Sequence, residues 1–241
     1  MTFHPFSRRG RRSAGLALTV TVVVGASLLS APAALAAPAC WDDAPTDLDG
    51  GGPDVVVGFP SYDMPGALDA GAIVVFSNVG AANSSTPRAP TARRVYTADS
   101  FGLPVQGGAR FGSALFAVSD DAFREDDDDC ADLFVGAPGT TVGSLTGAGR
   151  VYLLGGGEGG LRSTVGDALD AVSLSMPGGA QTDAAFGAAV SVSGGVIAIG
   201  EPRRDVGSAV DAGRVVRVDH QVVGPDPVIS AITQGGGAEG R

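Results

Sequence analysis

The sequence contains no lysine and, among its 241 residues, only two histidines and two cysteines. Only one of the histidines, His220, lies after the N-terminal segment that is predicted below to be cleaved. A zinc site of the histidine and cysteine type and a catalytic cysteine–histidine pair are therefore both disfavoured. The Gly-x-Ser-x-Gly spacing of serine hydrolases is also absent. These absences argue against an enzyme that carries its own catalytic residues.

Charge is scarce as well. Charged residues form only 17% of the chain, and the formal net charge is −10. Such a composition fits a helical bundle or a coiled coil poorly, and an acidic chain repels the phosphate backbone of nucleic acids. Glycine is abundant instead, with 38 residues, and it is costly inside helices but useful at turns. The composition therefore predicts an all-β protein of many short strands, with no nucleic-acid partner.

The N-terminus has the three parts of a secretory signal peptide. Four arginines within 8–12 precede an apolar run at 16–29, and small residues follow at 31–39. We predict a signal peptide over residues 1–36, so that the mature chain begins at Ala37 and is secreted or associated with the cell surface. An uncleaved membrane anchor is the alternative, and the apolar run is short for a membrane span.

Export would place the two cysteines, Cys40 and Cys130, in a compartment where disulfides form. We hypothesise a bridge between them, although sequence spacing does not give the separation of their Cα atoms. A lipid anchor at Cys40 is disfavoured because 37–39 lacks the leucine-type residue that lipoprotein signals place three positions before the cysteine. The export route, twin-arginine or general, stays open. No later segment is long enough to span a membrane.

The chain repeats one pattern three times. A short apolar run ends in Gly-x-Pro, and 13 residues after that glycine an Ala-Gly pair opens a second apolar run. The glycine pairs are Gly58 and Gly71, Gly136 and Gly149, and Gly200 and Gly213. The apolar runs have the length of strands, and proline ends a strand because it cannot donate to a ladder. The predicted strands are 55–57, 133–135 and 196–199 before the connections, and 72–76, 150–154 and 214–218 after them.

A Phe-Gly pair precedes the pattern in the second and third copies, at 111–112 and 186–187. Each pair opens a run that predicts a further strand, at 113–118 and 188–192. From the glycine of this pair to the glycine of Gly-x-Pro there are 24 residues in the second copy and 13 in the third. The difference corresponds to an inserted loop at 120–129, which is rich in acidic residues.

These motifs resemble FG-GAP repeats, the units of the integrin-α-type β-propeller, over nearly all of residues 44–241. The second repeat is the fullest match, whereas the first lacks Phe-Gly and the third has Glu201 where the family prefers alanine. The resemblance implies an all-β, partial β-propeller of about three four-stranded blades, a fragment of a ring that in the family closes with seven blades. The implied repeats span approximately 44–100, 101–178 and 179–226, with the start of a fourth at 227–241.

The resemblance also implies calcium sites in the loop between the first two strands of a blade. Aspartates on alternate residues of such a loop supply the hard oxygen ligands that Ca²⁺ prefers. Both candidate loops depart from the family pattern, because Gly51 replaces the central acid of the first, and Arg124 and Asp129 replace the first ligand and the turn glycine of the second. The candidate ligands are Asp47, Asp49 and Asp54 in the first repeat, and Asp126, Asp128 and Asp132 in the second.

A solvated surface run is the alternative interpretation of the second loop, because its acids outnumber the ligands of one site. The third repeat has only Ser-Gly-Gly at 193–195 in this place, and we expect no calcium there.

By resemblance, the chain is predicted to be a secreted, non-enzymatic, calcium-binding module for adhesion-type interaction with an extracellular protein or a cell-surface ligand. In the family, ligand contacts tend to lie on connections that correspond here to 61–69, 139–147 and 203–211. The alternative is an accessory propeller of a secreted hydrolase, of the esterase or phospholipase type, whose catalytic residues are not in this chain. The identity of the partner cannot be read from the sequence.

Overall fold

The computed structural model describes residue 40 and residues 46–79, 89–119, 130–162, 165–219, 228–233 and 239–240. All of them belong to Ala37–Arg241, one of the two units into which contacts divide the chain. The other unit, Met1–Ala36, contains the predicted signal peptide and lies outside the described residues. The described secondary structure is strand apart from one 3₁₀ turn, η1 (Ala98–Phe101), which confirms the prediction of an all-β fold. Within these ranges, no helix is long and apolar enough to cross a membrane.

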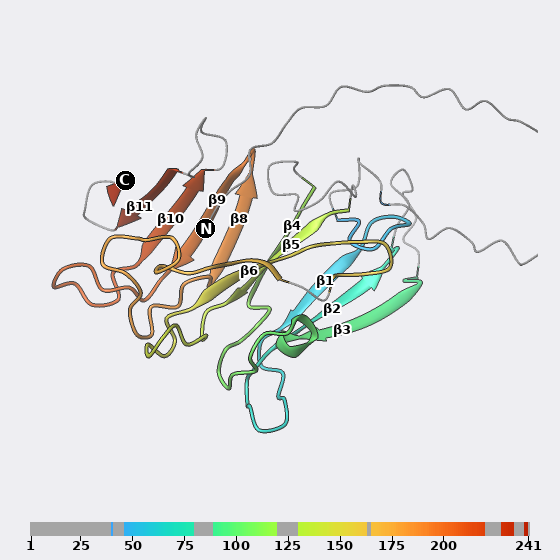
Figure 1. The fold of residues 1–241 in the computed structure, drawn as a ribbon, viewed down its shortest axis with the longest axis horizontal. Helices are drawn as coiled ribbons and strands as arrows, with labels where there is room; N and C mark the ends of the chain where they lie inside the picture. The colour runs from blue at the N-terminus through green and yellow to red at the C-terminus, as the bar shows by residue number, and fades with distance from the viewer. Residues whose placement is uncertain are drawn as a thin grey trace, which may run out of the picture. The chain divides into compact units, whose positions relative to one another are not determined.

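The described strands form three antiparallel sheets, here named blades 1, 2 and 3 (Figure 1). Blade 1 consists of β1 (Val55–Phe59), β2 (Ala72–Ser77) and β3 (Ala92–Thr97). Blade 2 consists of β4 (Ala114–Val118), β5 (Asp132–Ala137), β6 (Arg150–Leu154) and β7 (Val165–Leu169). Blade 3 consists of β8 (Ala189–Ser193), β9 (Val196–Glu201), β10 (Arg214–Asp219), β11 (Val228–Thr233) and β12 (Glu239–Gly240). Strands that follow one another in the chain are neighbours in the sheet, so the fold is a series of open meanders, consistent with a partial propeller.

Blade 2 has the four strands predicted for every blade, whereas blade 1 has three described strands and blade 3 has five. The two strands β11 and β12 lie in 227–241, the range assigned from sequence to the start of a fourth repeat. Both pair within blade 3, β11 with β10 and β12 with β11.

The 13-residue spacing encloses the same tight connection in all three blades. Proline follows β1, β5 and β9, as the sequence predicts, and the Ala-Gly pair immediately precedes β2, β6 and β10. Between them a small antiparallel bridge closes each connection: Met64 with Ala67, Val142 with Leu145, and Val206 with Ala209. The N–H of the Ala-Gly glycine then donates to a carbonyl at the start of the connection, at 2.9 Å in each blade. The equal spacing therefore corresponds to the same backbone path in all three connections.

The Phe-Gly pairs make the junctions between blades. The N–H of Phe111 donates to the carbonyl of Ala70 at 3.0 Å, and that of Phe186 donates to Ala148 at the same distance. The adjoining glycine Gly71 has a φ of 89°, and a Cβ built on it would lie 2.3 Å from backbone atoms of Phe111. Glycine is required here because its backbone approaches the next blade too closely for a side chain.

The apolar core has two parts, one on each face of blade 2. Along β5, Leu133 and Val135 belong to the cluster that includes Ile73 of blade 1, whereas Phe134 belongs to the cluster that includes Ile199 of blade 3. Alternation of side chains along a strand therefore sends successive residues to opposite blades. Every residue of β5 is buried, so blade 2 has no solvent-facing side at this strand.

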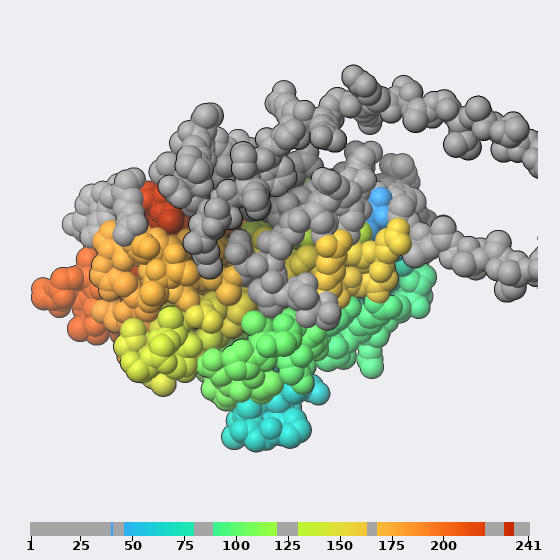
Figure 2. Space-filling view, viewed as in Figure 1, coloured from blue at the N-terminus to red at the C-terminus, as the bar shows by residue number. Residues whose placement is uncertain are grey.

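Blade 1, by contrast, exposes one apolar face. Val55, Val57 and Phe59 alternate along β1 and are 45%, 36% and 46% exposed, and Val95 of β3 is 51% exposed. Val57, Val74 and Val95 lie in one cross-strand row of the sheet. The connection between β1 and β2 also projects outward, as the cyan segment in Figure 2 shows.

Candidate metal site

The loop before β1 brings three carboxylates together. Gly50, Gly51 and Gly52 all have positive φ, at 83°, 100° and 136°, a conformation that glycine adopts without steric cost. The resulting turn places one carboxylate oxygen of each of Asp47, Asp49 and Asp54 within 4.8 Å of the others. These are the three residues that the sequence proposes as calcium ligands in the first repeat.

All three carboxylates are buried, at 0% exposed for Asp47, 7% for Asp49 and 4% for Asp54. Backbone N–H groups of the loop fix two of them: Gly50 donates to Asp47 Oδ1 and Leu48 donates to Asp54 Oδ2, each at 2.8 Å. Such bonds hold the loop in its turn and orient the carboxylates before any cation binds.

The end of β2 contributes the remaining contacts. The hydroxyl of Ser77 donates to Asp49 Oδ2, and the N–H of Asn78 donates to Asp54 Oδ1 at 2.8 Å. Sequence reasoning missed both residues, because they are 28 and 24 positions from the aspartates they contact. Only the pairing of β1 with β2, with Val55 opposite Phe76, brings the end of β2 beside the loop.

The electrostatics of the cluster favour a cation. Burial raises the pKa of Asp54 from 3.8 to about 7; the hydrogen bonds from Asn78 and Leu48 oppose this rise, and the neighbouring charges of Asp49 and Asp47 add to it. Crowded carboxylates in a dehydrated site disfavour their own ionisation. A bound divalent cation would reverse that effect, and the hard oxygen donors present suit Ca²⁺.

Blade 2 supports the loop from the other side. The carbonyls of Asp47, Leu48 and Asp49 accept hydrogen bonds from the N–H groups of Ala131, Gly157 and Gly159, at 2.8, 3.1 and 2.8 Å respectively. The three consecutive loop carbonyls are thus bonded to blade 2. The candidate site therefore lies at the junction between blades 1 and 2.

A disulfide joins Cys40 to Cys130, whose Cα atoms are 4.8 Å apart. Cys130 precedes Ala131, the residue that donates to the carbonyl of Asp47. The bridge thus anchors the chain before the candidate loop to the start of β5, over a sequence separation of 90 residues.

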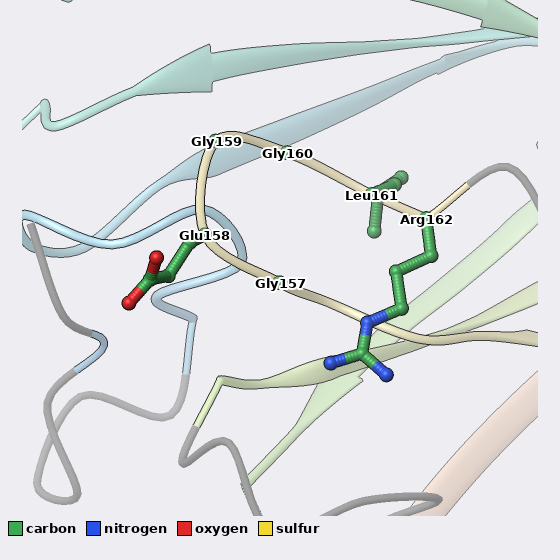
Figure 3. Close-up of a pocket in the computed structure, with 6 residues that line it drawn as sticks. All are labelled: Gly157, Glu158, Gly159, Gly160, Leu161 and Arg162. Atoms are coloured by element: carbon green, nitrogen blue, oxygen red, sulfur yellow. The ribbon is translucent and has the colours of Figure 1, made fainter. Parts of the chain in front are cut away.

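The glycine-rich segment after β6 lines a surface pocket formed by Gly157, Glu158, Gly159, Gly160, Leu161 and Arg162 (Figure 3). Figure 3 shows Glu158 and Arg162 on opposite sides of the turn of this segment, with both side chains extending toward the lower part of the view. The segment packs on the candidate loop, because Gly157 and Gly159 donate to the carbonyls of Leu48 and Asp49.

The second predicted calcium loop falls largely outside the described residues. Asp126 and Asp128 belong to that part of the chain, so the structure neither assembles nor separates their side chains. Asp132 is described, at the start of β5, where it is buried and accepts a hydrogen bond from the N–H of Gly156 at 3.0 Å. Asp54 accepts the equivalent bond from Asn78, and both donors lie seven residues after the glycine of Ala-Gly.

The third repeat has a different connection at this place. Gly194 and Gly195, with φ of 54° and 76°, form a tight turn between β8 and β9. This turn contains no carboxylate side chain.

The fold and the carboxylate loop together describe a protein of repeated propeller-type blades with a candidate cation site at a blade junction. No family model matches the chain. Over 128 residues, 53% of its length, the chain is 37% identical to integrin alpha-PS5 of Drosophila melanogaster. It spans about a tenth of that protein, 11% of its length, so the similarity concerns one segment of a much larger protein.

Proposed function

We propose that this chain is a non-enzymatic, extracellular propeller segment of the integrin-α type, which binds calcium and mediates interaction with another protein or a cell surface. The observation that supports it most directly is the buried cluster of Asp47, Asp49 and Asp54 in a repeated-blade fold. The similarity to an integrin α-chain supports the same class and an extracellular location. The disulfide agrees with an oxidising compartment.

Calcium would act here as a structural ion. It would neutralise three buried carboxylates in a loop whose carbonyls are bonded to blade 2. Because the loop links both blades, occupancy should stabilise their junction and not only the loop itself. Magnesium should substitute poorly, since it requires tight octahedral geometry and keeps its waters.

The connections between the second and third strands of the predicted blades are the proposed contact surface. The described connection at 61–69 carries Leu68, which is 72% exposed, and the one at 203–211 carries Val210, which is 75% exposed. Large apolar side chains this exposed at equivalent connections are suited to burial against a partner.

Calcium titration tests the metal part of the proposal. The protein purified from an oxidising compartment should bind calcium in isothermal titration calorimetry, and calcium should raise its melting temperature by mass action. Asp49→Asn and Asp54→Asn should each weaken binding strongly, whereas Asp63→Asn, an exposed residue outside the cluster, should leave it unchanged. No binding at millimolar calcium would overturn this part of the proposal. The same titration gives the stoichiometry, and a second equivalent would support the site proposed at Asp126, Asp128 and Asp132.

Binding to cells or extracellular matrix tests the interaction part. Leu68→Asp and Val210→Asp should reduce binding of the labelled protein to cell surfaces. Val172→Asp is the control, because Val172 is 57% exposed but lies outside these connections. Equal binding by all three variants would show that the proposed surface is not the one used.

A further inference from the structure

Two buried oxygen atoms beside the candidate loop have no hydrogen-bond partner among the described residues. They are Oδ1 of Asp49, a side chain that is more than nine-tenths buried, and Oδ1 of the Asn78 amide. Leaving a buried polar atom unpaired costs about 1–3 kcal/mol, so each of these two atoms needs a physical reason. Both oxygens are hydrogen-bond acceptors, so they cannot form a hydrogen bond with each other.

The backbone and amide nitrogen of Asn78 hold its side chain against the loop. Asn78 follows β2 with a φ of 57°, a left-handed conformation that asparagine tolerates better than most residues. Its backbone N–H donates to Asp54, and its side-chain Nδ2 donates to Thr91 Oγ1 at 3.0 Å. With the nitrogen committed to Thr91, the carbonyl oxygen of the amide is directed to the other side.

That oxygen lies against Gly51, in the middle of the loop. It is 2.7 Å from the position that a Cβ on Gly51 would occupy, and Gly51 stands between Asp49 and Asp54 in the sequence. The amide of Asn78 therefore fills the space in which a side chain of the loop itself would lie.

We propose that Asn78 Oδ1 is a fourth protein ligand of the cation held by Asp47, Asp49 and Asp54. This inference rests on the calcium site of the proposed function and adds a residue from outside its loop. Ca²⁺ takes 6–8 oxygen ligands and accepts asparagine carbonyls among them. An amide adds coordination without a fourth negative charge, and a cation at this place would satisfy both unpaired oxygens at once. The ion would then connect the loop to the end of β2, while the loop carbonyls bond the loop to blade 2.

The test compares calcium affinity in variants of Asn78. Asn78→Gly removes the amide while retaining a residue that tolerates the positive φ, and it should weaken calcium binding about tenfold or more, the loss expected from about 1.4 kcal/mol. Asn78→Asp keeps an oxygen at the same place and should bind calcium at least as tightly as the wild type. Asn83→Gly, the same chemical change at the only other asparagine of the sequence, is the control and should bind as the wild type does.

A second measurement reports on the ligand itself. Because the sequence has two asparagines, the side-chain amide resonances of Asn78 can be assigned from the Asn78→Gly variant, and they should shift when calcium is added. If the wild type binds calcium but Asn78→Gly binds it equally well and the Asn78 amide does not shift, Asn78 is not a ligand and the proposed site stands without it. If the wild type binds no calcium, the calcium part of the proposed function fails and this inference fails with it.

Discussion

Blades 2 and 3 contain the same Gly-x-Pro motif, but the charged residues that contact it differ between them. In blade 2, Ala137 of Gly-Ala-Pro lies opposite Arg150, and Arg150 pairs with Asp170 at 2.6 Å. In blade 3, Glu201 of Gly-Glu-Pro lies opposite Arg214 and pairs with it directly, also at 2.6 Å, with both side chains buried. In the third repeat, glutamate in place of alanine thus supplies the carboxylate that pairs with Arg214. In blade 2 the equivalent arginine, Arg150, pairs instead with Asp170.

The motif glycines differ in the same way. A Cβ on Gly136 of blade 2 would lie 2.1 Å from the carbonyl oxygen of Gly187 in blade 3. At the equivalent Gly200 the nearest atom is the Cβ of Ala189, in the same blade, at 3.3 Å. The same motif glycine therefore allows a close approach between two blades at Gly136, whereas at Gly200 its nearest neighbour belongs to its own sheet.

The largest expected effect is at the buried ion pair of blade 3. Glu201→Ala should destabilise the protein by about 3–5 kcal/mol, because it leaves buried Arg214 without its carboxylate. Urea unfolding monitored by circular dichroism would measure the change. Glu201 also pairs with buried Arg204 at 3.3 Å, so the control replaces Glu201, Arg204 and Arg214 together by methionine. This variant should recover most of the stability, since it leaves none of the three charges uncompensated. A loss below about 1 kcal/mol in Glu201→Ala would contradict the role assigned to this pair.

The glycine pair gives the next largest contrast. Gly136→Ala should cost about 3 kcal/mol, because the added methyl group would force blades 2 and 3 apart. Gly200→Ala should cost less than about 1 kcal/mol, since a neighbour at 3.3 Å needs to move only slightly. Parallel thermal and urea unfolding of the two variants would compare them, and equal losses would show that the junction does not depend on this approach.

The comparison extends to blade 1 through a pair of valines. Val57 and Val135 each precede the motif glycine, but Val57 is 36% exposed and Val135 is fully buried between blades 1 and 2. Val135→Ala should cost about 2 kcal/mol, from lost burial and the cavity left behind, and Val57→Ala well under about 1 kcal/mol. Similar losses at both positions would mean that another surface covers blade 1 in solution.

The last expected effect is a pH dependence of the calcium-free protein. Because the pKa of Asp54 is raised to about 7, the folded state retains a proton that the unfolded chain releases above its ordinary pKa of 3.8. The contribution to stability is therefore present at low pH and is lost as pH rises through about 7. Asparagine does not titrate, so Asp54→Asn should lack this decrease in stability. Unfolding of both proteins would be measured in chelator at about three pH values between about pH 5 and pH 8. Parallel pH profiles for the two proteins would contradict the assignment.

Local signals in the sequence were sufficient for the strands on either side of the repeated connections, and for the connections themselves. Proline after β1, β5 and β9, and glycine at the 13-residue spacing, act on the backbone of their own segment, so their effect can be predicted without knowledge of neighbours. The aspartates of the first loop were predicted from the resemblance to FG-GAP repeats, and Gly50, Gly51 and Gly52 turn the chain between them. The strand number of blades 1 and 3 was not, because pairing at a sheet edge depends on which segment is adjacent in space.

The sequence by itself determined an acidic, all-β chain of repeated short strands and the loop in which Asp47, Asp49 and Asp54 converge. Tertiary structure decided what surrounds those residues. Asn78 reaches the loop only because β2 pairs with β1, and Gly136 differs from Gly200 only because another blade packs against it. The physical reason is range: backbone preferences act within a few residues, whereas burial, electrostatic repulsion and unpaired oxygens depend on contacts between segments far apart in the chain.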